Sequence, residues 1–265
     1  MKKVAWRNII LILSLIGIIV LVAFINQHHK RQPVHNIAIV INHNDTDTLV
    51  IAKEIDELIH KSFGDLRGKA IEEINLRQLE DSINKTLFVA ATDSYIDFRK
   101  NLHINITQRK PIVRIADQNG SQFYIDTEGY KIPLSRRGSS DVIVASGVIR
   151  NEKNKQNPVV ATNLNEKEIL KSSTDLEKIY YLANYINLHP FFKNQIDQIY
   201  LNNKKEFELI PKVGNHIIVL GNLENLDKKF ENLFYLYRDG FSHTGWDIYK
   251  TINLKFDNQI VCTKY

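Results

Sequence analysis

The stretch from Leu102 to Pro133 constrains the fold most, because it reads as short strands separated by turns. Apolar and polar residues alternate from Leu102 to Thr107, which predicts a half-buried strand. Arg109-Lys110-Pro111 interrupts this pattern, since proline cannot donate a hydrogen bond within a central strand. Asn119-Gly120 then predicts a tight hairpin, because both residues tolerate positive φ. The stretch contains no metal-ligand cluster and no phosphate-binding loop, so we interpret it as scaffold.

The composition predicts a globular protein that needs no metal and no other cofactor. Of its 265 residues, 43% are hydrophobic and 25% are charged. The net charge is +5, but basic residues are mixed with acids, as in Asp227-Lys228-Lys229-Phe230-Glu231, which argues against nucleic-acid binding. Cys262 is the single cysteine, so an internal disulfide and a thiolate metal cluster are excluded. The nine histidines lack the paired spacing of metal ligands.

Residues 9–25 predict an uncleaved membrane anchor. The apolar run is interrupted only by Ser14 and Gly17, and as a helix it spans roughly 25 Å. A cleaved signal peptide is the alternative, but Asn26-Gln27-His28-His29 does not resemble a cleavage site. We therefore expect a cytoplasmic tail at residues 1–8, a single helix in the lipid bilayer, a linker at residues 26–33 and an exported remainder.

The order of elements in residues 34–110 is predicted to be β-α-α-β-β. Strands are expected at Val34–Ile41, Phe88–Phe98 and Leu102–Thr107. Asp45 or Asp47 is the expected N-cap of a first helix that carries Ile51, Ile55, Leu58 and Ile59 on one face. Asn75 with Gln78 predicts the start of a second helix. Two helices on one face of a three-stranded sheet form a two-layer domain that resembles a POTRA (polypeptide-transport-associated) domain.

Residues 111–265 predict a mostly antiparallel β domain with two flanking helices, so the fold class is α+β. Thr174 and Glu177 form a capping box for a helix that ends before Pro190. A second helix is expected from Glu224 to Tyr237. The expected strands are Val142–Ala145, Ile196–Leu201, Glu206–Ile210, His216–Leu220 and a last strand or hairpin, Tyr249–Cys262, in which Ile252, Leu254 and Phe256 share one face.

Five motifs, in order along the chain, resemble those of the FtsQ/DivIB family of bacterial cell-division proteins. They are Arg109-Lys110-Pro111-Ile112, Tyr124-Ile125-Asp126-Thr127-Glu128-Gly129, Val142-Ile143-Val144-Ala145-Ser146-Gly147, Ile217-Ile218-Val219-Leu220-Gly221 and Ile252-Asn253-Leu254-Lys255-Phe256. Gln108 departs from the pattern, because an acidic residue is common before the arginine. The resemblance implies a non-catalytic, single-pass scaffold of the inner membrane at the division septum. Its N-terminus would be cytoplasmic and its bulk periplasmic, and it would couple septum assembly to wall synthesis.

The resemblance also implies protein partners of the FtsB and FtsL type, with further divisome proteins as candidates for the POTRA-like domain. In the family, FtsB adds a strand near the end of the β domain, where an edge strand offers unpaired backbone groups. The candidate contact residues in this chain are Tyr249, Thr251, Asn253, Lys255 and Phe256. The alternative is a simple closing strand with Phe256 in the core. Trp246, after a turn, is interpreted as a core-covering aromatic rather than a partner anchor.

Two other functions fit parts of the sequence. Ser82-Ile83-Asn84-Lys85 matches the Ser-x-x-Lys of penicillin-interacting serine enzymes, and Tyr185-Ile186-Asn187 and His243-Thr244-Gly245 loosely match their other two motifs. However, Ser82 is predicted late in a short amphipathic helix, and the third motif lacks its lysine. The second alternative is a different POTRA-containing protein-assembly module.

Overall fold

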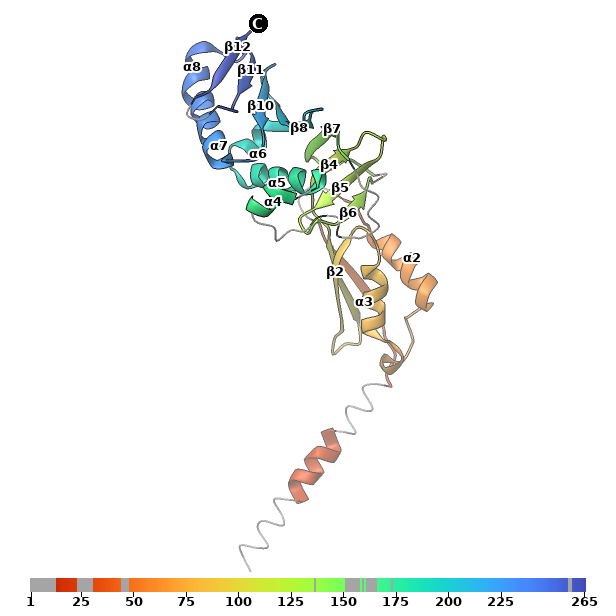
Figure 1. Cartoon of the computed structure of the whole chain (residues 1–265). Helices are drawn as coiled ribbons and strands as arrows, with labels where there is room; N and C mark the ends of the chain where they lie inside the picture. The colour runs from red at the N-terminus through yellow and green to blue at the C-terminus, as the bar shows by residue number, and fades with distance from the viewer. Residues whose placement is uncertain are drawn as a thin grey trace, which may run out of the picture. The chain divides into compact units, whose positions relative to one another are not determined.

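The computed structural model describes residues 13–22, 31–43, 48–135, 137–150, 158, 160, 166–172, 174–256 and 259–265 (Figure 1). The chain divides into two compact units, Met1–Gln108 and Arg109–Tyr265. Residues 13–22 are helical, and their large apolar side chains are 51% to 62% exposed. Within the described ranges, no helix combines the length and the apolar content needed to cross a membrane. The rest of the predicted anchor, residues 9–12 and 23–25, lies outside the described residues.

Unit 1 contains a three-stranded sheet and two helices in the predicted β-α-α-β-β order. The strands β1 (Ile37–Asn42), β2 (Val89–Ile96) and β3 (Leu102–Gln108) lie in the order β1-β3-β2, with β1 parallel and β2 antiparallel to β3. The helices are α2 (Ala52–Phe63) and α3 (Leu76–Asn84), with the short 3-10 helix η1 (Ile71–Glu73) between them. One core joins the two layers through Ile55, Ile59, Leu79, Ile83, Leu102, Ile104 and Ile106.

Of the two helix caps predicted in unit 1, the structure confirms the second. Asn75 caps α3 as predicted, because its side chain accepts a hydrogen bond of 3.1 Å from the Gln78 backbone. By contrast, α2 begins only after Ile51, and the Gln108 side chain accepts hydrogen bonds from the backbone of Leu49 and Val50 at 2.7 and 3.2 Å. The predicted caps Asp45 and Asp47 lie outside the described residues. Gln108, the departure from the family pattern, thus holds the segment that leads into α2.

Unit 2 is built on one nine-stranded sheet in the order β12-β11-β10-β9-β8-β7-β4-β5-β6. Antiparallel pairs predominate, as predicted, but β4–β7, β7–β8 and β10–β11 are parallel. Parallel neighbours need long crossovers, and helices connect β7 to β8 and β10 to β11. The strands are β4 (Pro111–Ala116), β5 (Gln122–Asp126), β6 (Lys131–Pro133), β7 (Ile143–Gly147), β8 (Ile196–Leu201), β9 (Phe207–Pro211), β10 (Ile217–Gly221), β11 (Tyr249–Asn253) and β12 (Val261–Lys264).

Both predicted long helices of unit 2 are present. The first, α5 (Asp175–Leu188), starts at the capping box, in which Glu177 accepts from the Thr174 backbone at 2.8 Å and Thr174 accepts from the Glu177 backbone at 3.3 Å. The second, α7 (Leu226–Tyr235), continues as the π-helical turn η2 (Leu236–Gly240). The sequence did not predict three short helices, α4 (Glu166–Ser172), α6 (Phe192–Gln195) and α8 (Phe241–Thr244). They are too short for a periodic pattern.

Two turns position the first strands of unit 2. In the predicted hairpin only Gly120 takes a positive φ, 78°, and the Asp117 side chain accepts from the backbone of Asn119 and Ser121. In the next turn the buried Asp126 accepts from the Tyr130 backbone at 2.7 Å and from the Arg109 side chain, also at 2.7 Å. The two turns therefore depend on aspartate side chains as much as on glycine.

Candidate protein-binding edge

At the C-terminal end of the sheet in unit 2, the edge strand is β12, not β11, which carries most of the predicted contact residues. Strand β11 lies between β10 and β12, and its backbone is paired on both sides. Within the part of the chain that the structure describes, β12 pairs with β11 alone. The backbone groups on the outer side of β12 are therefore the ones that could receive another strand at this end of the sheet.

The two faces of the sheet differ beside this edge. Ile252 and Leu254 are buried, which confirms the predicted inward face. Thr251 and Asn253 lie on the other face and are only partly buried. On that face the register places Ile217 and Val219 on one side of β11, and Thr263 and Val261 on the other. Ile217 is 39% exposed and Val261 is 40% exposed, so apolar surface borders the edge.

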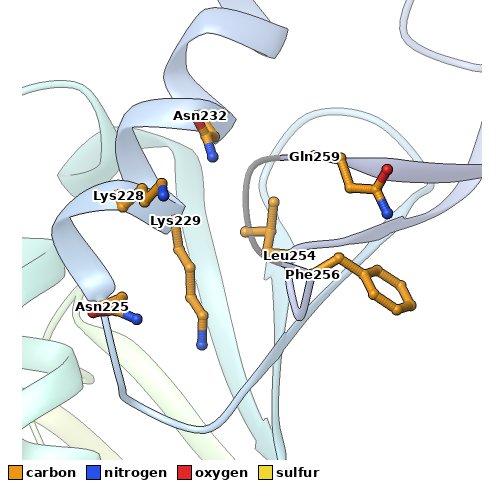
Figure 2. A pocket seen from close by; sticks show the side chains of 7 residues that line it. All are labelled: Asn225, Lys228, Lys229, Asn232, Leu254, Phe256 and Gln259. Carbon is orange, nitrogen blue, oxygen red and sulfur yellow. The ribbon is translucent and has the colours of Figure 1, made fainter.

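The sequence predicts Phe256 on the same face as Ile252 and Leu254. This prediction is wrong, because Phe256 does not continue the buried face. The strand ends at Asn253, and the alternation of inward and outward side chains ends with it. Phe256 is 48% exposed, and its ring points away from α7 (Figure 2). Tyr249, at the other end of β11, stacks on Phe241 with ring centroids 6.0 Å apart. Of these two aromatics, Phe256 is thus the more accessible to a partner.

Lys255 is engaged inside the unit. Its ammonium group lies 2.5 Å from the Glu206 carboxylate, and this hydrogen bond lowers the pKa of Glu206. The stem of Lys255 passes over Gly221, where φ is +77° and an added Cβ would lie 2.7 Å from Lys255 Cγ. This contact links two of the family motifs and explains the glycine at the end of β10. The charge of Lys255 is therefore partly neutralised before any partner binds.

The depression between α7 and the β11–β12 connection is too small for a ligand. Figure 2 shows its lining side chains, which are Asn225, Lys228, Lys229, Asn232, Leu254, Phe256 and Gln259. It encloses about 10 Å³, which is at most the space of one water molecule. Lys228 and Lys229 of α7 line the same depression, and the Phe256 ring points away from them (Figure 2). This surface suits contact with a protein rather than capture of a small molecule.

The C-terminal end of β12 is tied to the turn before β10. The Tyr265 hydroxyl donates a hydrogen bond of 2.9 Å to the Asn215 carbonyl. Cys262 is half-buried within β12, and burial raises the pKa of its thiol. A thiol with a raised pKa is a poor nucleophile, so we assign it a packing role.

Trp246 belongs to an aromatic cluster, as interpreted from the sequence. Its ring stacks on Tyr237 at 5.3 Å and contacts Phe241 at 5.0 Å. The buried His216 lies 2.7 Å from the Tyr237 hydroxyl, and burial lowers the pKa of His216 and raises that of Tyr237. These rings pack the π-helical turn against the start of β11 and thereby support the edge.

The alternative catalytic motif shows no structural support as an active site. Ser82 lies near the end of the nine-residue helix α3, and Lys85 is the residue that caps this helix. Both belong to unit 1, whereas the two loosely matching motifs lie in unit 2. Among the residues that the structure describes, no group of three or more histidine, cysteine or acidic side chains could hold a metal ion.

Comparison with known families matches both units. The family model "FtsQ/DivIB, C-terminal related" matches residues 110–263, and the model "POTRA-like domain" matches residues 32–107. No curated protein matches the chain significantly. The two matched ranges correspond closely to the two compact units.

Proposed function

The chain belongs to the FtsQ/DivIB family of cell-division proteins, and we propose that it is a single-pass scaffold of the bacterial divisome. FtsQ/DivIB and POTRA-like domains are non-catalytic scaffold domains, and the family takes part in protein–protein interactions within the divisome. We propose further that this protein couples septum assembly to wall synthesis by holding FtsB- and FtsL-type partners. The observation that carries the proposal is the free edge β12 at the end of the matched domain.

The proposed interface is β12 together with the open face beside it. A partner strand would pair with the outer backbone groups of β12, and apolar partner side chains would cover Val261 and Ile217. Of the predicted contact residues, Thr251 and Asn253 lie on this face, and Phe256 is exposed just beyond it. Tyr249 and Lys255 remain proposed contacts, although both already have intramolecular partners.

The proposed location is the inner membrane at the division septum, with the N-terminus cytoplasmic and the two domains, residues 34–110 and 111–265, periplasmic. The apolar run of residues 9–25, together with the exposed apolar side chains of helical residues 13–22, supports an anchor in the lipid bilayer. The proposed parts are the tail 1–8, the anchor 9–25, the linker 26–33, the POTRA-like domain 34–110 and the β domain 111–265. The POTRA-like domain is the candidate site for a further divisome partner.

Co-purification with the FtsB and FtsL homologues from the same organism tests this function. We expect a complex with the full chain, and a loss of affinity of at least about tenfold for Val261→Lys, because a charge would be buried at the interface. Leu188→Lys is the matched control, since Leu188 is 76% exposed at the end of α5, away from the edge. No complex, or equal loss for both variants, would refute the proposed interface.

Labelling by a fluorescent penicillin tests the catalytic alternative. The scaffold function predicts no labelling that depends on Ser82, because this serine lies near the end of a short helix in a non-catalytic domain. Labelling of the full chain that disappears in Ser82→Ala would instead establish the enzyme.

A further inference from the structure

The turn that joins β2 to β3 holds an aromatic side chain out into solvent. Phe98 is 81% exposed, the largest value for any large apolar side chain that the structure describes. The turn is rigid, because Asp97 accepts from the backbone of Lys100 and Asn101 at 2.9 Å each, and Lys100 takes a φ of 67°. The Phe98 ring is therefore presented by a fixed turn rather than by a loose loop.

The same turn carries two cations, one of which lies beside the ring. The Arg99 guanidinium carbon lies 5.4 Å from the Phe98 ring centroid, and Lys100 follows. The one carboxylate of the turn, Asp97, is engaged by the backbone of Asn101 and by His103, which together lower its pKa. Aromatic side chains with neighbouring lysine or arginine are typical of segments that lie on a membrane surface. The turn has this composition, and its one carboxylate is already engaged within the turn.

Backbone hydrogen bonds fix this turn next to the start of the unit. The His35 backbone donates to the Lys100 carbonyl at 2.9 Å, and the Leu102 backbone donates to the Asn36 carbonyl at 2.8 Å. The linker, residues 26–33, therefore leads almost directly from the proposed anchor to this end of unit 1. Eight residues reach about 30 Å at most, so Val34 stays within that distance of where the anchor leaves the bilayer, and the turn is hydrogen-bonded to the next residue, His35.

A second loop lies at this end of the unit and carries charges of both signs. Val34 donates to the Lys69 carbonyl at 2.9 Å, and Gly68 donates to the Val34 carbonyl at 2.9 Å, which places the loop before η1 beside the start of β1. This loop carries Arg67 and Lys69. The carboxylates in the same region are Asp65, which lies 3.9 Å from Arg67, and the exposed Glu72 and Glu73 of η1. The two basic residues of this loop are therefore offset by three carboxylates, and the positive charge of the proposed contact comes from Arg99 and Lys100.

We propose that this end of unit 1 rests on anionic phospholipid, with Phe98 in the interfacial layer and Arg99 and Lys100 on lipid phosphates. The inference depends on the proposed membrane anchor, because the tether supplies the high local lipid concentration. The contact would fix the orientation of unit 1 relative to the bilayer, with β1, β2 and β3 extending away from the membrane surface. Leu87 is an internal contrast, since it is 53% exposed but lies before β2 at the opposite end of the sheet.

Lipid-phase quenching in the full chain tests this contact. In a Cys262→Ser background, which removes the single cysteine, Phe98→Cys and Leu87→Cys are labelled with an environment-sensitive fluorophore. The chain is reconstituted in phosphatidylglycerol vesicles that contain a shallow lipid quencher. We expect at least about twofold stronger quenching at position 98 than at 87, reduced in phosphatidylcholine and by Arg99→Ala with Lys100→Ala. Equal quenching at both positions would overturn the proposal.

A second measurement leaves Phe98 in place and distinguishes a failure of the lipid contact from a failure of the membrane anchor. Trypsin cleavage after Arg99 and Lys100 should be slower in phosphatidylglycerol than in phosphatidylcholine vesicles, and Phe98→Ser should remove the difference. Alkaline extraction of the same vesicles reports whether the chain is anchored at all. A chain that is extracted refutes the anchor and with it the lipid contact. A chain that stays anchored but shows no protection refutes the lipid contact alone.

Discussion

Arg109 donates a hydrogen bond of 2.7 Å to Asp126, and both side chains are largely buried, with exposures of 10% and 1%. The guanidinium group also lies 3.9 Å from the Tyr130 ring centroid. Two motifs that the sequence shows as separate, the Arg-x-Pro and the Asp-x-x-Gly, therefore form one cluster at the start of unit 2. We assign both motifs a structural role in fixing the first strands of the sheet.

Removal of the Arg109 side chain should destabilise unit 2 strongly. Arg109→Ala leaves the Asp126 carboxylate buried without its cation, which costs about 3–5 kcal/mol. Chemical denaturation of the full chain, read from the unfolding transition of unit 2, measures the loss. Lys193→Ala is the control, because Lys193 is exposed on α6, and it should change stability by less than about 0.5 kcal/mol. Equal effects of the two substitutions would contradict the assigned role.

Gly147 should tolerate alanine far less well than Gly120. Both residues have positive φ, at 106° and 78°, and share the cost of about 1–2 kcal/mol for a side chain there. A Cβ at Gly147 would also clash with the Leu201 carbonyl oxygen, whereas nothing lies within 4 Å of one at Gly120. Thermal unfolding of both alanine variants should show an extra loss of about 1–3 kcal/mol for Gly147→Ala. Similar losses would contradict the strand geometry at this position.

Stability of unit 2 should fall as the pH drops below about 6.5, in part through His216. Burial lowers the pKa of His216 in the folded state, so the unfolded chain takes up the proton first. Stability from this residue is therefore complete above the unfolded pKa and is lost at up to about 1.4 kcal/mol per pH unit below it. Melting curves between about pH 7.5 and pH 5.5 should be flatter for His216→Gln than for the wild type. An equally steep pH dependence in both proteins would contradict this role of the buried imidazole.

Lys255 should contribute little to partner affinity. Its ammonium group already pairs with Glu206, and the side chains are 39% and 28% exposed. Lys255→Ala should therefore weaken a complex with FtsB and FtsL homologues less than about threefold. Titration calorimetry with Lys255→Ala, Glu206→Gln and the double variant separates the two roles. A loss above about tenfold for Lys255→Ala alone would show that the partner takes over this ion pair.

Local features could be predicted from the sequence, and long-range features could not. The caps at Asn75 and Thr174 and the strand Ile196–Leu201 depend on neighbouring residues, and the structure confirms them. The hydrogen bonds by which Gln108 holds the segment before α2 could not be foreseen, because its partners are 58 and 59 residues away. The two predicted helices each lie between two predicted strands, which is typical of parallel pairs. The prediction of a mostly antiparallel domain did not use this signal.

The candidate edge shows the same division. The sequence located the closing hairpin and the buried Ile252 and Leu254, because alternation is local. It could not show that β12 pairs with the outer side of β11, because the pairing partner of a strand depends on tertiary structure. Phe256 was misplaced because the alternation was extended beyond the end of the strand at Asn253.

Backbone hydrogen exchange of β12, with and without the partners, tests the central claim most directly. Strand addition to this edge predicts slower exchange at residues 261–264 in the full chain when the FtsB and FtsL homologues bind. The opposite edge of the same sheet, β6 (Lys131–Pro133), provides the internal control and should exchange unchanged. Formation of the complex without protection of β12, or with equal protection of β6, would contradict the account.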